Sequence, residues 1–241
     1  IALGIMCKAP VSGASKTRLC PPLTAGEAAQ LSRCFIADVA LVLGAVPAEA
    51  GTRGFAVFTP AEDAHRFEGL LPAGFGMLAQ RGADLGERLL HAAEDLLDGG
   101  FDGVCLINSD SPTLPVSLLA QSVSALRCDG DRLVLGPAID GGYYLIGLKR
   151  AHARLFRGIA WSTAQVLAQT LAAAAALSLP SAVLPVWYDV DDAASLQLLM
   201  HEVFGGGTPL ASDGLTGSPA PRSREYLRHL LQGGDASRLG F

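Results

Sequence analysis

Short apolar runs alternate with helix-like segments through most of the chain, and this alternation restricts the possible folds more than any other feature. Residues 1–7 and 104–107 are apolar throughout, which is typical of strands buried on both faces of a sheet. Thr24 and Glu27 have the spacing of a capping box, and apolar residues recur after them at helical intervals through about Leu43. The alternation predicts an α/β fold, with a mainly parallel central sheet and helices on both faces.

The same patterns predict the remaining elements. Strands are expected at 54–59, 76–80, 132–136, 143–148 and 182–190, and helices at 61–68, 85–98, 116–126, 162–177 and 193–204. From Gly205 the composition shifts to Gly, Ser and Pro, and one more amphipathic helix is expected at 222–232. We therefore predict a domain at 1–204 and, at 205–241, a linker with a helical tail. That tail could pack back, exchange with a second copy in an oligomer, or stay disordered.

Composition excludes several classes of protein. The net charge of -5 argues against a non-specific nucleic-acid binder, which needs a dominant basic field. Five cysteines without a CxxC pair indicate neither a disulfide framework nor a zinc site, and a reducing cytoplasm is the simplest expectation. The longest apolar stretch, 171–186, is interrupted by Ser and Pro, so no membrane span or membrane partner is expected. No signal segment is visible, although the sequence begins at Ile1 rather than at a Met.

The segment 8–19 follows the first apolar run and carries three cations in a region without acids before Glu27. Ligands of open α/β sheets bind at the carboxyl ends of strands, where a loop with Gly and Lys suits phosphate. The loop is not a Walker motif, because Ser15 stands where Gly is needed, and no GxGxxG occurs in the chain. Lys16 and Arg18 could bind phosphate as a point charge and a bidentate fork, whereas a solvated basic loop would have the same composition.

Three aspartates form the second group of candidates. Asp110 follows an apolar strand, where it would face the ligand edge or hold the turn before Pro112. Asp189 and Asp191 would share one face of a strand, and two such carboxylates about 4 Å apart near a surface repel by about 4 kcal/mol. A divalent cation would relieve that repulsion, and Mg²⁺ commonly binds carboxylates together with phosphate oxygens. The alternative is that the pair caps the helix at Ala193.

Three further segments combine sharp turns with polar groups. Asp140-Gly141-Gly142-Tyr143 could bring the backbone close to a ligand, or could be a plain hairpin turn. The loop 80–88 could contact a base or ribose, or only cap the next helix. Trp161-Ser162-Thr163 opens an expected helix, so its hydroxyls could be caps or anion ligands.

The motifs together resemble a bacterial family of nucleotide-diphospho-sugar transferase-like proteins, also known as radical-SAM/selenodomain-associated transferases, with a glycosyltransferase-A-like fold. The family pattern is matched by Lys8-Ala-Pro, Lys16-Thr-Arg-Leu, Leu85-Gly-Glu-Arg, Ser109-Asp-Ser-Pro, Asp140-Gly-Gly-Tyr-Tyr-Leu-Ile-Gly-Leu, Trp161-Ser-Thr and Asp189-Val-Asp. The match covers about 1–204 with the motifs in the family's order.

This resemblance implies a Rossmann-like fold whose first loop holds nucleotide phosphates and whose metal is bound by a carboxylate that Asp110 resembles. Related phospholactate guanylyltransferase-like nucleotidyltransferases place a late Asp-x-Asp near the metal, which would fall on Asp189 and Asp191. The chain departs from the family pattern at Ser12, commonly Pro, and at Asp192-Ala193, commonly Thr-Pro. It also carries a single acid at 109–111, which leaves the number of metals open.

The leading hypothesis is a glycosyltransferase-A-like enzyme that binds a nucleotide sugar with Mg²⁺ or Mn²⁺ and transfers the sugar to a small acceptor. The alternatives are a nucleotidyltransferase that releases pyrophosphate from an NTP, and a non-catalytic nucleotide-binding module. The expected nucleotide- and phosphate-binding residues are Lys8, Gly13, Lys16, Thr17, Arg18, Gln80 and Gly82. Catalysis is assigned to Lys16, Asp110 and Asp140, metal binding to Asp110, Asp189 and Asp191, and acceptor contacts to Gly141, Gly142, Tyr143, Trp161, Ser162 and Thr163.

Overall fold

A seven-stranded sheet in the order β3-β2-β1-β4-β6-β5-β7 forms the centre of the molecule. The computed structural model describes residues 1–47, 50–210, 214–235 and 238–239. The strands are β1 (Ala2–Lys8), β2 (Arg53–Thr59), β3 (Gly76–Ala79), β4 (Val104–Asn108), β5 (Leu133–Pro137), β6 (Tyr143–Leu148) and β7 (Ser181–Val183). Only β6 is antiparallel to its neighbours in this sheet. The predicted α/β fold with a mainly parallel sheet is confirmed.

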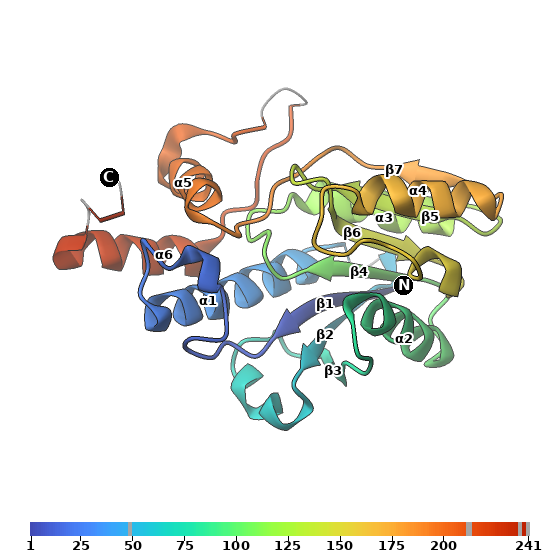
Figure 1. Cartoon of the computed structure of the whole chain (residues 1–241), viewed down its shortest axis with the longest axis horizontal. Helices are drawn as coiled ribbons and strands as arrows, with labels where there is room; N and C mark the ends of the chain where they lie inside the picture. Colours follow the sequence, from blue (N-terminus) through green and yellow to red (C-terminus); the bar gives the residue numbers. More distant parts are fainter. Residues whose placement is uncertain (48–49, 211–213, 236–237, 240–241) are drawn as a thin grey trace.

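Helices cover both faces of the sheet (Figure 1). The helices are α1 (Ala25–Gly44), α2 (Leu85–Asp98), α3 (Val116–Arg127), α4 (Val166–Ala176), α5 (Ala193–His201) and α6 (Pro221–Leu230). One apolar cluster contains side chains of α1, α3, α5 and α6, and a second contains those of α2 and α4. Short 3₁₀ segments occur at Thr17–Leu19, Ala61–Phe67 and Ala153–Leu155, and π-helical turns at Glu202–Gly206 and Leu231–Asp235.

The predicted helix starts at Thr24 and Asp84 are present. Thr24 and Glu27 form the full reciprocal capping box of α1. Asp84 caps α2 by accepting a hydrogen bond from the Glu87 amide, but the Glu87 carboxylate accepts from Ala83 rather than from the cap residue. Both helices therefore begin where short polar side chains satisfy their first free amides.

Two predicted elements differ most from the structure. The strand expected at 182–190 ends at Val183, followed only by an isolated bridge between Ala138 and Trp187. Pro185 has no amide hydrogen to continue the ladder, so the segment leaves regular strand geometry. The helix expected at 162–177 begins at Val166, because Ser162 has a φ of 62°, outside the helical region. The inference that strand geometry aligns Asp189 with Asp191 is therefore wrong.

Part of the C-terminal tail packs back on its own chain. Leu227 and Leu230 of α6 belong to the same apolar cluster as α1. At the start of α6, the carboxylate of the buried Asp38 accepts hydrogen bonds from the amides of Arg222 and Ser223 and from the Ser223 hydroxyl, at 2.6–2.9 Å. Of the three fates considered for the tail, packing back is the one observed. The predicted domain boundary at 204–205 stays a prediction.

The sheet also fixes where a ligand can approach. β1 lies between β2 and β4, so the chain leaves it toward β2 and β3 and later returns to its other side as β4. Such a switch point leaves a crevice at the carboxyl ends of the strands, where open α/β sheets bind ligands. The loops after β1 and β4 begin there. No helix in the described ranges combines the length and hydrophobicity needed to cross a bilayer.

Candidate functional site at the ends of β1 and β4

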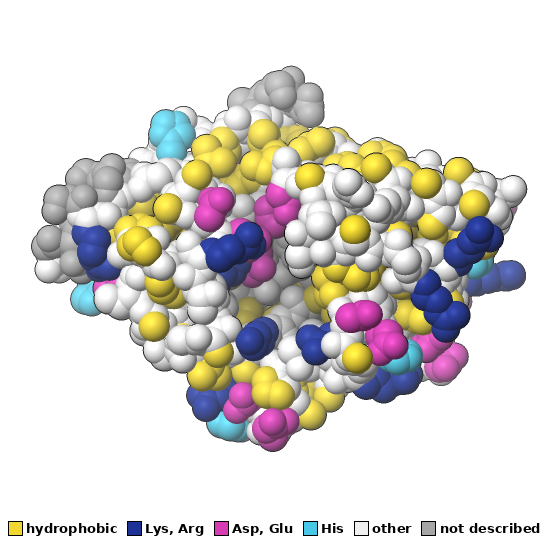
Figure 2. All heavy atoms as spheres, in the orientation of Figure 1, with side chains coloured by type: hydrophobic (Ala, Val, Ile, Leu, Met, Phe, Trp, Pro, Cys, Tyr) yellow, Lys and Arg dark blue, Asp and Glu magenta, His cyan; other side chains and the backbone are white. Residues whose placement is uncertain are grey.

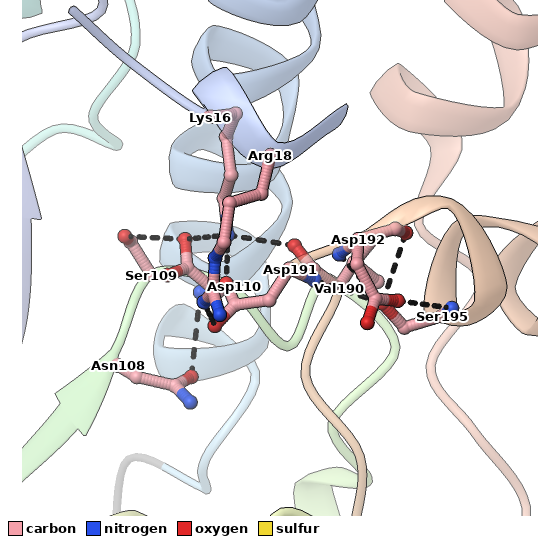
Figure 3. Close-up of polar contacts among 9 residues, drawn as sticks. All are labelled: Lys16, Arg18, Asn108, Ser109, Asp110, Val190, Asp191, Asp192 and Ser195. Atoms are coloured by element: carbon pink, nitrogen blue, oxygen red, sulfur yellow. Dashed lines mark hydrogen bonds and ion pairs between the residues drawn. The ribbon is translucent and has the colours of Figure 1, made fainter. Parts of the chain in front are cut away.

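Lys16 is the centre of a polar cluster at the switch point (Figure 3). Its Nζ lies 2.9 Å from Asp110 Oδ1 and 2.7 Å from Asp191 Oδ1. The same ammonium donates a hydrogen bond to the carbonyl of Val190 at 2.7 Å and lies 5.7 Å from the centre of the Phe35 ring. Only 8% of the Lys16 side chain is exposed, compared with 30% of Asp110. The first loop and two distant carboxylates therefore form one site.

The loop geometry that aims Lys16 depends on Ser15. The Ser15 hydroxyl donates to the Ala9 carbonyl at 3.0 Å and accepts from the Val11 amide at 3.1 Å, which closes the loop. Lys16 itself has φ 50° and ψ 40°, in the left-handed region that costs a non-glycine residue on the order of 1–3 kcal/mol. The residue that excludes a Walker motif thus holds this loop together.

Charge stabilises the ammonium form of Lys16. Burial is the largest single influence and lowers the pKa of Lys16, but Asp110 and Asp191 together outweigh it. The pKa of Lys16 therefore lies above its ordinary value, and the side chain is cationic at neutral pH.

Asp191 faces the site, whereas its neighbour caps a helix. The Asp191 carboxylate contacts Lys16 with one oxygen, and its Oδ2 lies 2.5 Å from Arg18 Nη2. Asp192 is the cap residue of α5 and forms a reciprocal capping box with Ser195. Helix capping was the alternative considered for Asp189 and Asp191. The residue that caps α5 is Asp192, so the Asp191 carboxylate does not cap that helix.

Asp110 is also not a helix cap, because α3 begins after Pro115. Its Oδ1 accepts a hydrogen bond from the Ser109 hydroxyl at 3.0 Å, and its amide donates to Asn108 Oδ1 at 3.3 Å. The Asp110 carbonyl accepts from the Val190 amide at 2.8 Å, which joins the loop after β4 to the segment that carries Asp191. This backbone bond brings the two carboxylates together across a long sequence separation.

A pocket of about 400 Å³ opens beside this cluster. Figure 2 shows a hollow near the middle of that face, with basic and acidic side chains gathered around it. Five of the expected phosphate-site residues and two of the expected metal ligands line the pocket: Lys8, Lys16, Thr17, Arg18, Gln80, Asp110 and Asp191. Arg88 also lines it and was missed as a site residue. Its signal was the Leu85-Gly-Glu-Arg motif at the end of the loop 80–88, which was considered for contact with a base or ribose and for helix capping.

Gln80 and the two expected glycines, Gly13 and Gly82, shape the loops around the pocket. Gln80 Nε2 donates to the carbonyls of Val57 at 2.7 Å and Cys7 at 3.3 Å, which anchors this side chain across the strand ends. Gly13 and Gly82 have φ values of +75° and +130° and are not part of the pocket wall. A Cβ at Gly82 would lie 2.7 Å from Glu87 Cβ, so this glycine permits the tight approach to α2.

The expected acceptor residues form a second cluster outside that pocket. The turn at Gly141 packs on the segment before α4, since a Cβ there would lie 2.4 Å from the Ala164 carbonyl oxygen. The rings of Tyr143 and Trp161 are edge to face at 6.4 Å. Burial raises the pKa of the Tyr143 hydroxyl, which has no hydrogen-bond partner in the described part of the chain. Thr163 Oγ1 accepts from the Gln165 amide at 3.3 Å, within the turn that precedes α4.

Asp189 and Asp140 connect the two clusters electrostatically. Burial, followed by the negative charges of Asp191, Asp140 and Asp110, raises the pKa of Asp189 to about 7. Asp140 is exposed, and its Oδ1 accepts from the Gly142 amide at 2.8 Å. Asp191, Asp140 and Asp110 therefore all lie within electrostatic reach of Asp189.

The chemical type of these side chains fits a hard divalent cation, because Mg²⁺ and Mn²⁺ prefer carboxylate oxygens. Their oxygens are not arranged around a common point where a cation could bind directly. Lys16 holds one oxygen each of Asp110 and Asp191. Within the described ranges, no three or more His, Cys, Asp or Glu side chains are grouped to hold a metal ion. Metal binding stays a prediction.

Comparisons with solved structures agree with this fold. A crystal structure named as a "putative nucleotide-diphospho-sugar transferase" from Desulfovibrio desulfuricans G20 matches with a TM-score of 0.80 and 29% identity, over 99% of this chain and 96% of that one. A CMP:2-keto-3-deoxy-manno-octonic acid synthetase solved with CTP matches with a TM-score of 0.53 and 13% identity, over 82% of this chain and 96% of that one. A cytidylyltransferase from Leptospira borgpetersenii matches with a TM-score of 0.50 and 12% identity, over 99% and 95%. The last two show a shared fold.

No curated protein matches the chain in sequence. The family described as "Uncharacterized protein conserved in bacteria (DUF2064)" matches residues 42–163, just over half of the chain. This match and the similarity to the Desulfovibrio structure confirm the resemblance inferred from the motifs. The chain is a member of the bacterial DUF2064 family.

Proposed function

We propose that this protein is a transferase that binds a nucleotide sugar in the pocket beside Lys16 and moves the sugar to a small acceptor, assisted by Mg²⁺ or Mn²⁺. The observation that carries the proposal is the convergence of Lys16, Asp110 and Asp191 at the switch point of the sheet. The pocket volume of about 400 Å³ is within the range of small-molecule sites. The name of the Desulfovibrio structure supports the same class of donor.

Positive side chains on one wall would bind the diphosphate. Lys8, Arg18 and Arg88 line the pocket with Lys16, and hydrogen bonds between charged partners contribute about 1.5–3 kcal/mol each. Gln80 and Gly82 would lie beside the base or ribose. Fixed cations aimed at a diphosphate leaving group stabilise the charge that develops as the glycosyl bond breaks, so catalysis would be mainly electrostatic.

The carboxylates would supply the rest of the site. Asp110, Asp189 and Asp191 are the residues that would hold a divalent cation, which when bound adds positive charge at the leaving diphosphate. Asp140, exposed on the neighbouring turn, is the proposed base that takes the proton of the acceptor hydroxyl. The acceptor would lie against Gly141, Gly142, Tyr143, Trp161, Ser162 and Thr163.

One observation supports nucleotidyl transfer as a second candidate. The pocket wall carries four cationic side chains, and the two carboxylates on it leave an excess of two positive charges. This excess would suit the three phosphates of an NTP, whose α-phosphate would join a phosphorylated acceptor while pyrophosphate leaves. The same fold occurs in a synthetase solved with CTP.

Product analysis separates the candidates. The purified protein is incubated with Mg²⁺ or Mn²⁺ and either a panel of NDP-sugars or a panel of NTPs with candidate phosphorylated acceptors. Release of an NDP from a nucleotide sugar would support glycosyl transfer, and release of pyrophosphate would support the alternative. Either activity should fall by at least about 100-fold in Asp110→Asn, because a metal-site charge is lost. Neither product in any combination, with no nucleotide binding, would contradict both.

A further inference from the structure

The ammonium of Lys16 stands between the two carboxylates that are expected to bind a cation. It contacts Asp110 Oδ1 at 2.9 Å and Asp191 Oδ1 at 2.7 Å, and it is largely screened from solvent, with 8% of its side chain exposed. The other oxygen of Asp191 lies 2.5 Å from Arg18. Both oxygens of Asp191 are therefore paired with cationic side chains of the protein itself.

Lys16 cannot keep all its present hydrogen bonds and also donate one to a phosphate. Its three donor hydrogens are matched by three acceptors: the two carboxylates and the Val190 carbonyl at 2.7 Å. A phosphate in the pocket that gains Lys16 must therefore draw it away from at least one of these partners. A divalent cation placed between the carboxylates would repel the ammonium from the same position.

We propose that Lys16 is an internal counter-ion that competes with a divalent cation for the Asp110–Asp191 pair, and that a phosphate ligand relieves this competition by drawing Lys16 away. Cation and diphosphate then bind with positive coupling, because each favours the position of Lys16 that the other requires. The proposal rests on the proposed function for the identity of the diphosphate ligand. The competition between Lys16 and the cation is a property of the chain's own side chains.

The decisive variant is Lys16→Met, which keeps the length of the side chain and removes its charge. Mn²⁺ binding is measured without any nucleotide, by calorimetry and by the electron paramagnetic resonance signal of free Mn²⁺. We expect the variant to bind Mn²⁺ at least about tenfold more tightly than the wild type, because the competing cation is gone. An unchanged or weaker Mn²⁺ affinity in a folded Lys16→Met protein would overturn the proposal.

Lys8→Met is the matched control. Lys8 lines the same pocket and loses the same charge, but its Nζ donates to the Ala14 carbonyl at 3.0 Å and pairs with neither carboxylate. Its nucleotide-free Mn²⁺ affinity should change by no more than about twofold, as expected for an exposed and screened charge. An equal gain in both variants would show a general charge effect and would also overturn the proposal.

A second test uses the wild type, so it does not depend on whether the variant folds. Lysine acetylation by a water-soluble reagent is followed by mass spectrometry with and without saturating Mn²⁺. Lys16 should be protected without Mn²⁺ and labelled several-fold faster with it, while Lys8 labels at the same rate in both. Equal Lys16 labelling under both conditions would contradict the proposal that the cation displaces Lys16 from the two carboxylates.

The outcomes also separate this proposal from the proposed function. If Lys16→Met gains Mn²⁺ affinity but no NTP or NDP-sugar binds the wild type, the counter-ion role stands and the proposed function fails. If nucleotides bind the wild type but Lys16→Met gains no Mn²⁺ affinity, the counter-ion role fails alone.

Discussion

At the scale of single residues, Arg88 is the cation that extends the basic wall of the pocket beyond the first loop. It lies in the first turn of α2, and its Nε donates to the Gly82 carbonyl at 3.2 Å, which holds the guanidinium at the pocket. The turn at Gly82 that receives this bond needs a glycine, with φ +130°. Loop and helix therefore position Arg88 together.

Arg88→Ala should weaken nucleotide binding by about 10- to 100-fold, the loss expected for a hydrogen bond between charged partners. Calorimetry with the best-binding nucleotide measures the effect. Arg81→Ala is the matched control, because Arg81 belongs to the same loop but pairs with Asp95 at 2.6 Å and does not line the pocket. Equal losses in the two variants would show that Arg88 has no direct contact with the nucleotide.

At the scale of elements, the joint between α1 and α6 depends on one buried carboxylate. Asp38 is 1% exposed and accepts all three hydrogen bonds offered by Arg222 and Ser223 at the start of α6. Burial is the largest influence and raises the pKa of Asp38 above its ordinary value, while these hydrogen bonds oppose it. The native state therefore binds this proton more readily than the unfolded state does.

The sign of the resulting pH dependence follows from this shift. The stabilisation contributed by Asp38 is complete below its unfolded pKa of about 3.8 and falls as pH rises through the higher native pKa. The free energy of unfolding of the wild type, minus that of Asp38→Asn, should therefore decrease over that window in urea titrations. A difference that stays constant or increases with pH would contradict the assignment.

Ser223→Ala should lower the free energy of unfolding by about 1.5–3 kcal/mol in the same assay, because a hydrogen bond to a buried charge is removed.

At the scale of the whole molecule, sequence periodicity predicts the elements and the class of fold. It predicts much less about which strands are neighbours. Lys16 and Asp110 could be expected at one edge, since carboxyl ends of parallel strands meet there. The contact of Asp191 with Lys16 could not be expected from periodicity. Asp191 lies in an irregular segment, and the hydrogen bond of the Val190 amide to the Asp110 carbonyl holds that segment in place. Periodicity predicts a strand for this segment, but the segment is irregular and is held by tertiary hydrogen bonds.

The functional account depends most on one property of the whole site, that it binds nucleotides through Lys16. Calorimetry of the wild type with saturating Mn²⁺ and a panel of NDP-sugars and NTPs measures it directly. The account predicts a saturable heat for at least one nucleotide and a loss of affinity of about 10- to 100-fold in Lys16→Ala, even with Mn²⁺ saturating. Nucleotide affinity that is equal in the wild type and in folded Lys16→Ala, or no binding to any member of the panel, would contradict it.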